Sequence, residues 1–248
     1  MRIVVLDTEE QFNKTVALMV AAQLVQKPHS NIGMAGGSTT GGVHRELVSL
    51  YEAGVISFKD AHLFSIDIRY PLPLDHPGSI RALMARELYD HVDLPKDHAH
   101  TPDSSGDDPQ QAVDDYIQLI RDLGGLDMQV LPIGENGHIG NCQPGTPFGG
   151  SAMVRELPPE YKSEEKALPF GGAHLFGGVE GIPLTSLTFG PKDVMHAREI
   201  LLCAKGAHKA EVMGKVVNGP VTEDVPASIV QLHPHATIVL EKEAAKYL

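Results

Sequence analysis

Positively charged residues are scarce in this chain of 248 residues. It has 20 lysines and arginines against 32 aspartates and glutamates, which gives a formal net charge of −12 at pH 7. Proteins that bind nucleic acids need a concentrated basic surface to neutralise phosphates. The charge balance therefore argues against a nucleic-acid partner. An anionic small-molecule substrate would need a local cluster of cations to overcome the overall field.

Cysteines are also few, and no apolar run is long enough to span a membrane. Cys142 and Cys203 are the only cysteines, and neither lies in a C-x-x-C pair, so we expect reduced structural thiols and no metal site. The richest apolar window, residues 16–25, contains Gln23 and is too short to cross a bilayer. The first residues resemble a strand rather than a signal peptide, so we expect a cytoplasmic protein without a membrane partner.

The chain does contain a regular alternation of strand-like and helix-like segments. Apolar runs predict strands at residues 3–6, 31–35, 62–66, 128–133, 186–189, 199–204 and 236–240. Helical spacing predicts helices at residues 8–26, 40–53, 79–89, 109–123 and 207–217, with Ser79 as an N-cap. This alternation predicts one α/β domain over residues 1–248, with a Rossmann-like, mostly parallel sheet and helices on both faces.

The segment 144–181 interrupts this alternation. Pairs of glycines follow Phe148, Phe170 and Phe176, and two prolines lie between them. Long irregular segments inside a compact domain are often functional lids, and glycine pairs allow such a lid to move. We expect a lid at residues 146–181, with a surface insertion that has no role in binding as the alternative.

A glycine-rich segment with one histidine follows the predicted strand at 128–133. Gly134, Gly137 and His138 would lie at the carboxyl end of that strand, which is where open α/β sheets bind ligands. Glycine also allows backbone N–H groups to approach a substrate closely. From this segment alone, a strand-to-helix turn with a surface histidine remains an equal alternative.

A second glycine-rich segment, residues 35–42, follows one predicted strand and opens a helix. It contains Gly36, Gly37, Ser38 and Thr39 but matches neither the Walker A pattern nor G-x-G-x-x-G. Free N–H groups at a helix N-terminus, the helix dipole and hydroxyl donors together make an anion site. We therefore expect phosphate binding here, although a tight turn would use the same residues.

Two charged side chains follow other predicted strands. Asp67 comes just after the strand at 62–66, where a partly desolvated carboxylate has a raised pKa and can act as a base. Lys209 lies near the start of the helix after the strand at 199–204 and could reach a phosphate as a point charge. The alternatives are that Asp67 caps a turn and that Lys209 is a solvated surface lysine.

Together these segments resemble the glucosamine-6-phosphate deaminase family, which is related to the 6-phosphogluconolactonases. The resemblance runs nearly end to end. Residues 36–39 resemble the family's phosphate loop, 134–139 its G-x-G-x-D/N-G-H-I motif, and 206–209 its phosphate lysine motif, G-x-x-K. Residues 64–79 resemble F-x-x-D-E-Y…DHP-x-S, and 227–234 resemble S-x-L-Q-L-H-P. DHP-x-S and the last motif favour a deaminase over a lactonase.

The resemblance implies an enzyme of amino sugar metabolism that needs no metal or organic cofactor. It would isomerise and deaminate an amino hexose 6-phosphate, glucosamine or galactosamine 6-phosphate, to a ketohexose 6-phosphate and ammonia. By position, Asp67 would move a proton between C2 and C1, and His138 would assist ring opening. The implied contacts to the substrate and its phosphate are Gly36, Gly37, Ser38, Thr39, Gly137, Thr146 and Lys209. A homo-oligomer is compatible with the sequence.

Three carboxylates of the family motifs are neutral in this chain. Ile68, Asn136 and Gln143 stand in their places, and Asn136 and Gln143 belong to the implied catalytic group around His138. Amides can orient a histidine, but they do not stabilise its charged form. His138 should therefore be a poorer proton acceptor than its family counterparts.

Two further departures concern cations. The family's lid arginine has no clear counterpart, and four residues could replace it: His174, Arg155, Lys162 and Lys166. Arg69 stands where lactonases have the arginine of D-E-R. Three alternatives therefore stay open: a 6-phosphogluconolactonase, a non-deaminating sugar-phosphate isomerase, and a catalytically weakened sugar-phosphate-binding paralogue.

Overall fold

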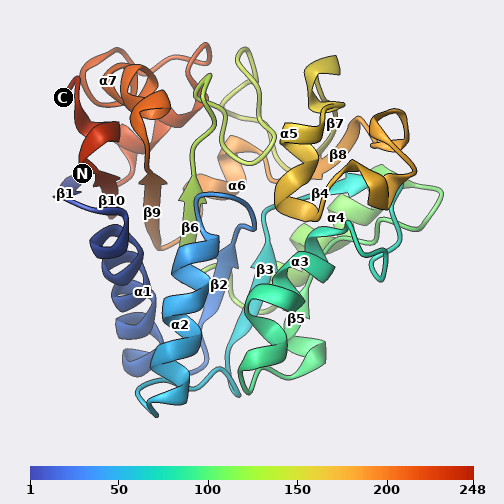
Figure 1. Ribbon diagram of the computed structural model, residues 1–248, viewed down its shortest axis with the longest axis horizontal. Coiled ribbons are helices and arrows are strands. Elements are labelled where there is room, and N and C mark those ends of the chain that lie inside the picture. The colour runs from blue at the N-terminus through green and yellow to red at the C-terminus, as the bar shows by residue number, and fades with distance from the viewer.

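A seven-stranded sheet forms the centre of the molecule in the computed structural model, which describes residues 1–248 (Figure 1). Its strand order is β1-β10-β9-β6-β2-β3-β5, and all neighbouring strands are parallel. The strands are β1 (Arg2–Leu6), β2 (Asn31–Met34), β3 (His62–Ser65), β5 (Ala99–His100), β6 (Met128–Pro132), β9 (Glu199–Ala204) and β10 (Ala236–Glu241). The predicted parallel sheet is confirmed.

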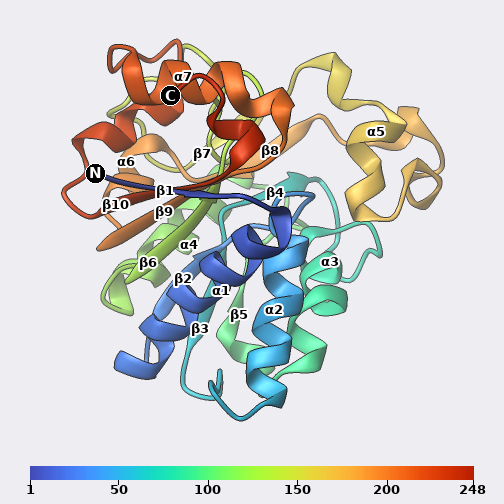
Figure 2. The same cartoon turned by 60° about the vertical axis from the view of Figure 1, so that its left-hand side comes forward.

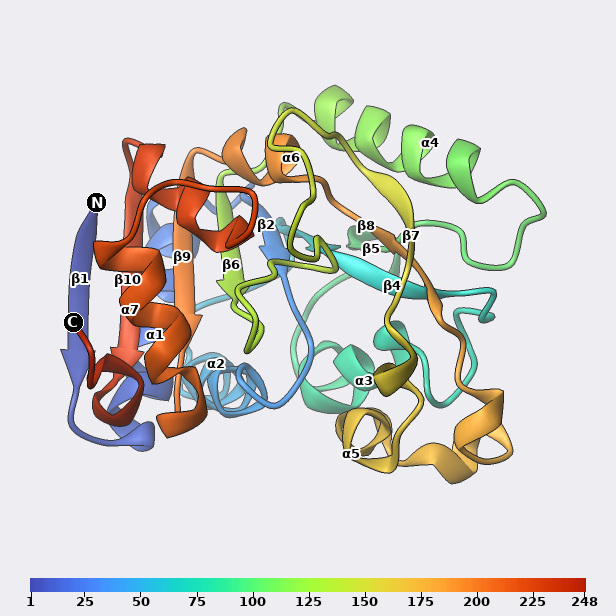
Figure 3. The same ribbon diagram turned by 90° about the horizontal axis from the view of Figure 1, so that it is seen from above.

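Helices cover both faces of this sheet, as predicted. They are α1 (Glu9–Gln26), α2 (Gly41–Glu52), α3 (Ile80–Glu87), α4 (Pro109–Asp122), α6 (Pro191–Met195) and α7 (Ala210–Asn218). Helices α1, α2 and α3 pack on one face, whereas α4 and α6 lie on the other side of the strands (Figures 2 and 3). Strand β6 is buried on both faces of the sheet: Met128 and Val130 enter one core, and Leu131 enters the other.

Side chains cap the N-termini of α1, α3 and α4. Thr8, Ser79 and Asp108 accept hydrogen bonds from backbone N–H groups in the first turns of α1, α3 and α4. The predicted cap at Ser79 is therefore confirmed, with 3.0 Å between its hydroxyl oxygen and the Ala82 nitrogen. Helix α2 differs because no side chain caps it, which leaves its first turn open to another acceptor.

A second, three-stranded antiparallel sheet lies beside the large one (Figure 3). It has the order β4-β8-β7, formed by β4 (Asp67–Tyr70), β8 (Thr185–Thr188) and β7 (Met153–Glu156). The strand expected at 186–189 therefore does not join the parallel sheet. Strands β4, β5 and β7 were not predicted: β4 begins after a single residue beyond β3, β5 has only two residues, and β7 lies within the glycine-rich segment.

The expected lid region is anchored at its start. Strand β7 pairs with β8, and the Leu157 N–H then donates to the Leu184 carbonyl at 2.6 Å. Residues 157–184 thus leave the sheet and return through a closed neck, carrying α5 (Glu164–Ala167) and short 3-10 turns. No helix in the chain combines the length and apolar character that crossing a membrane requires.

Candidate active site

A cavity of about 420 Å³ opens at the carboxyl ends of the parallel strands. The loops after β2, β3, β6 and β9 form it together with residues 161–170 of the lid region. Strand order reverses between β2 and β6, and ligands bind at such a switch point in open α/β sheets. The polar side chains that line it are Ser38, Thr39, Thr40, Asp67, Arg69, Glu135, His138, Asn141, Tyr161, Glu165, Lys166, His208 and Lys209.

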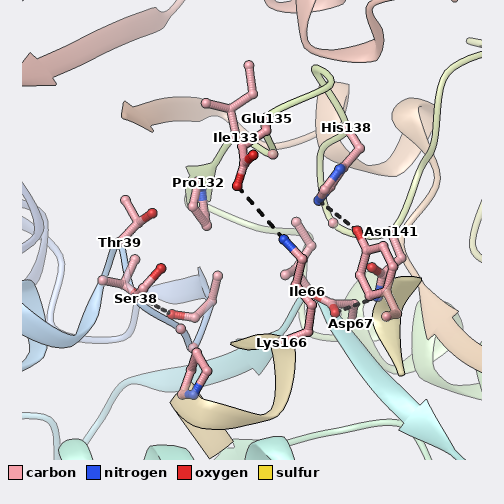
Figure 4. Close-up of a pocket in the computed structure, with 18 of the residues that line it drawn as sticks. Ser38, Thr39, Ile66, Asp67, Pro132, Ile133, Glu135, His138, Asn141 and Lys166 are labelled. Carbon is pink, nitrogen blue, oxygen red and sulfur yellow. Dashed lines mark hydrogen bonds and ion pairs between the residues drawn. The ribbon is translucent and has the colours of Figure 1, made fainter. Parts of the chain in front are cut away.

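One side of the cavity has the properties of an anion site. Gly36, Gly37, Ser38 and Thr39 line it, immediately before the uncapped N-terminus of α2. Gly37 has φ +136°, a conformation that residues with a side chain rarely adopt. Ser38 and Thr39 face Asp67 and Asn141 across the cavity in Figure 4. Backbone N–H groups and hydroxyls in this arrangement suit a phosphate.

Lys209 brings a positive charge to the same cavity. Only 8% of the residue is exposed, and its ammonium group forms no ion pair with a carboxylate of the chain. Burial lowers the pKa of Lys209, the nearby Glu135 opposes that shift, and Lys166 adds to it. A buried charge without a partner is costly, so this ammonium group favours an anionic ligand.

Lys166 is the one candidate for the family's lid cation that lines the cavity. It extends from α5 and lies 3.8 Å from Glu135 in an ion pair, which Figure 4 shows between the two sides of the site. The other three candidates lie outside the cavity lining: Arg155, Lys162 and His174. Helix α5 therefore places Lys166 in the cavity, whereas the sequence alone left four candidates for the lid cation.

Asp67 is the first residue of β4 and faces the cavity beside Asn141. The Asn141 side chain donates to the Asp67 carboxylate at 2.7 Å and to the Ser186 hydroxyl at 2.7 Å. Burial raises the pKa of Asp67 to about 6, against the opposing effects of the Arg69 charge and the Asn141 hydrogen bond. A carboxylate with this pKa is available as a base near neutral pH. Asn141 was not among the predicted site residues, although it lies two residues after the motif at 134–139.

His138 lies over a glycine of its own loop. A Cβ atom at Gly134 would overlap the imidazole ring, so a larger residue there would displace it. Burial lowers the pKa of His138 to about 4, and the charges of Lys209 and Lys166 add to that shift. The ring is therefore neutral at physiological pH.

Asn136 and Gln143 do not line the cavity but surround His138. Asn136 Oδ1 lies 2.7 Å from His138 Nδ1, and Asn136 Nδ2 donates to Gln143 Oε1 at 2.9 Å. Gln143 Nε2 donates to the Tyr161 hydroxyl at 3.2 Å, and that hydroxyl lies 3.5 Å from His138 Nε2. The structure thus places both amides behind the histidine rather than against a substrate. Tyr161 was missed because its position depends on the path of the lid region.

Two of the implied substrate contacts, Thr146 and Gly137, do not line the cavity. Thr146 is fully buried outside the cavity lining, and its hydroxyl donates to the Gln143 carbonyl at 2.6 Å, so it cannot contact a substrate there. Gly137 also lies outside the lining, where φ +90° and the nearby Val225 indicate a turn residue. Ile68 is buried opposite Leu187 in the small sheet, where a carboxylate would be desolvated.

Comparisons with known sequences agree with this architecture. The family model described as glucosamine-6-phosphate isomerases/6-phosphogluconolactonase matches residues 7–239. A glucosamine-6-phosphate deaminase from Clostridium botulinum is 33% identical over 248 residues, which cover 100% of this chain and 99% of the relative. A glucosamine-6-phosphate deaminase from Geobacillus sp. is 35% identical over 235 residues, covering 95% of this chain and 91% of the relative.

Solved structures give the same result. A monomeric glucosamine-6-phosphate deaminase superposes with a TM-score of 0.92 at 31% identity, covering 100% of both chains. A 6-phosphogluconolactonase from Trypanosoma brucei has a TM-score of 0.79 at 18% identity, covering 100% of this chain and 98% of its own, and so shows the fold alone. With the sequence matches covering nearly the whole chain, the protein belongs to the glucosamine-6-phosphate isomerase/6-phosphogluconolactonase family.

Proposed function

We propose that this protein converts an amino hexose 6-phosphate and water into a ketohexose 6-phosphate and ammonia. Glucosamine and galactosamine 6-phosphate are the proposed substrates. The observation that carries the proposal is one cavity with Asp67 and His138 on one side and an anion site on the other. The full-length relatives named as glucosamine-6-phosphate deaminases support this activity over lactone hydrolysis.

The proposed chemistry consists of proton transfers and the addition of water. His138 takes the proton of the anomeric hydroxyl and delivers it to the ring oxygen as the C1–O5 bond breaks, so the sugar opens to an aldehyde and His138 is neutral again. Asp67 then removes the C2 proton and returns it to C1, while one amine proton passes to O1, so the C2 amine becomes an imine and C1 becomes a primary alcohol. Water adds to the imine carbon, and ammonia leaves to give the ketone. Asp67 suits this role because burial raises its pKa to about 6, close to neutral pH.

An assay of ammonia release tests this function. Glucosamine, galactosamine and mannosamine 6-phosphates should be compared, with hydrolysis of 6-phosphogluconolactone measured in parallel. We expect ammonia and ketose phosphate in equal amounts from at least one amino sugar, and slower lactone hydrolysis. Lactone hydrolysis without ammonia release would instead identify a lactonase.

Lactone hydrolysis is the second candidate function because of Arg69. Its guanidinium group lines the cavity, donates to the Pro183 carbonyl at 2.7 Å and lies 5.4 Å from the centre of the Tyr161 ring. It is therefore held in place at the position that resembles the lactonase arginine. A neutral His138 could also remove a proton from an attacking water.

Lys209→Ala should raise the Kd for a hexose 6-phosphate by one to two orders of magnitude. This corresponds to roughly 1.4–3 kcal/mol for a charge-assisted contact. Isothermal titration with glucose 6-phosphate measures it, and Lys205→Ala is the matched control because Lys205 pairs with Glu9 at 2.7 Å outside the cavity. Equal affinities for wild type and Lys209→Ala would remove Lys209 from the phosphate site.

The lid region should become more ordered when a sugar phosphate binds. We propose that residues 157–184 close over the substrate, because Tyr161 and Lys166 reach the cavity from this loop. Their amide hydrogens should exchange more slowly in the presence of a saturating hexose 6-phosphate. Strand β7 is an internal control, since its pairing with β8 protects it without ligand. Unchanged exchange across the loop would support a surface insertion.

A further inference from the structure

We propose that Tyr161 is a positioning residue for His138. In this proposal its hydroxyl donates to His138 Nε2 and holds that nitrogen as a hydrogen-bond acceptor until a substrate hydroxyl takes its place. The catalytic use of this nitrogen rests on the proposed function, but the hydrogen-bonding role is independent of it. The same contacts explain why Asn136 and Gln143 replace carboxylates in this chain.

Four side chains form a closed ring of hydrogen bonds. It runs from His138 to Asn136, from Asn136 to Gln143, from Gln143 to Tyr161 and back to His138, with separations of 2.7, 2.9, 3.2 and 3.5 Å. Each member can donate one hydrogen bond and accept one around such a ring. All four side chains therefore satisfy each other without a charged group.

A backbone group fixes the direction of this ring. The His138 backbone N–H donates to Asn136 Oδ1 at 3.2 Å, and a backbone N–H can only donate. Asn136 must therefore direct its oxygen at His138 and its nitrogen at Gln143. His138 then carries its proton on Nδ1, and the remaining partner, the Tyr161 hydroxyl, must donate to Nε2.

The bond from Tyr161 is suited to replacement by a substrate. At 3.5 Å it is the longest in the ring, so breaking it costs little. Arg69 and Lys166 lie over the Tyr161 ring, 5.4 and 5.9 Å from its centre, and hold the tyrosine at the cavity wall. A hydroxyl of the sugar can therefore donate to Nε2 instead, without changing the tautomer that Asn136 has set.

A carboxylate at position 143 would not permit this ring. It could accept from Asn136, but it could not donate to Tyr161, and it would attract the Tyr161 hydroxyl proton to itself. Gln143 and Tyr161 thus form a matched pair. We infer that the neutral residues around His138 are an adaptation to Tyr161 rather than a loss of catalytic machinery.

Nitrogen NMR of the histidines tests the hydrogen bond without any turnover. In the wild type, His138 should show a protonated Nδ1 and an Nε2 resonance shifted by an accepted hydrogen bond. Tyr161→Phe should move the Nε2 resonance toward that of a free unprotonated imidazole nitrogen. His138→Gln assigns the signals, and the exposed Tyr247→Phe is the matched control. An unchanged Nε2 resonance in Tyr161→Phe would overturn the proposal.

A double-mutant cycle tests the pairing with Gln143. If the wild type releases ammonia, Tyr161→Phe should lower kcat about 10- to 100-fold, the scale seen for groups that orient a functional histidine. In the Gln143→Glu background the Tyr161 hydroxyl should already donate to the new carboxylate instead of to His138. Tyr161→Phe should therefore have almost no effect on kcat in that background. Equal effects in both backgrounds would contradict the pairing. A wild type without ammonia release would overturn the proposed function, while the NMR result would still decide the role of Tyr161.

Discussion

Asp67→Asn should lower kcat for ammonia release by about 10²–10⁴, the usual contribution of a general base. Asparagine keeps the size of the side chain, and its oxygen can still accept from Asn141, which lies 2.7 Å from the carboxylate in the wild type. The variant therefore loses basicity while the geometry of the site remains. Binding of a non-reacting hexose 6-phosphate should change little, because the anion site lies across the cavity.

Thermal unfolding and a pH profile provide the controls. Burial raises the pKa of Asp67 from 3.8 to about 6, so the ionised carboxylate destabilises the folded state at pH values above its unfolded pKa. Asp67→Asn should therefore be at least as stable as wild type at pH 8, and any gain should disappear below about pH 4. Wild-type kcat/KM should fall as the pH is lowered through about 6. Intact turnover in a folded Asp67→Asn variant would exclude the deaminase mechanism.

His138→Gln should discriminate between closed and open forms of the substrate. We expect kcat/KM for a ring-forming amino hexose 6-phosphate to fall by about 10²–10⁴, because ring opening loses its acid–base group. A 4,5-dideoxy analogue lacks both hydroxyls that could close a ring on C1, so its turnover should fall far less. Steady-state ammonia release from the two compounds gives the comparison. Equal losses would assign His138 to a later step or to the stability of the loop.

The parallel sheet and much of the cavity could be predicted because they depend on local patterns. Apolar runs identified the central strands, and the carboxyl ends of parallel strands meet at one edge. Asp67, His138 and Lys209 therefore meet in one cavity although they lie far apart in the sequence. The resemblance to a family then supplied roles that the pattern alone could not.

The surroundings of these residues could not be predicted, because they depend on contacts between distant segments. Asn141 reaches Asp67 only after β4 pairs with β8, whose residues lie more than 100 positions away. Tyr161 reaches His138 only through the path of the loop after β7. Thr146 is a different case, since the resemblance implied a substrate contact but the turn directs its hydroxyl at the Gln143 carbonyl.

The closed neck between Leu157 and Leu184 allows the loop at residues 157–184 to change in length and sequence without disturbing the two sheets. Its two ends are joined by a 2.6 Å hydrogen bond and by the pairing of β7 with β8, so changes in its length are absorbed outside the sheets. Asp67 and the segment 36–39 belong to parts of the chain that such changes do not touch. Evolution can therefore revise what covers the cavity while Asp67 and the anion-binding segment 36–39 stay constant.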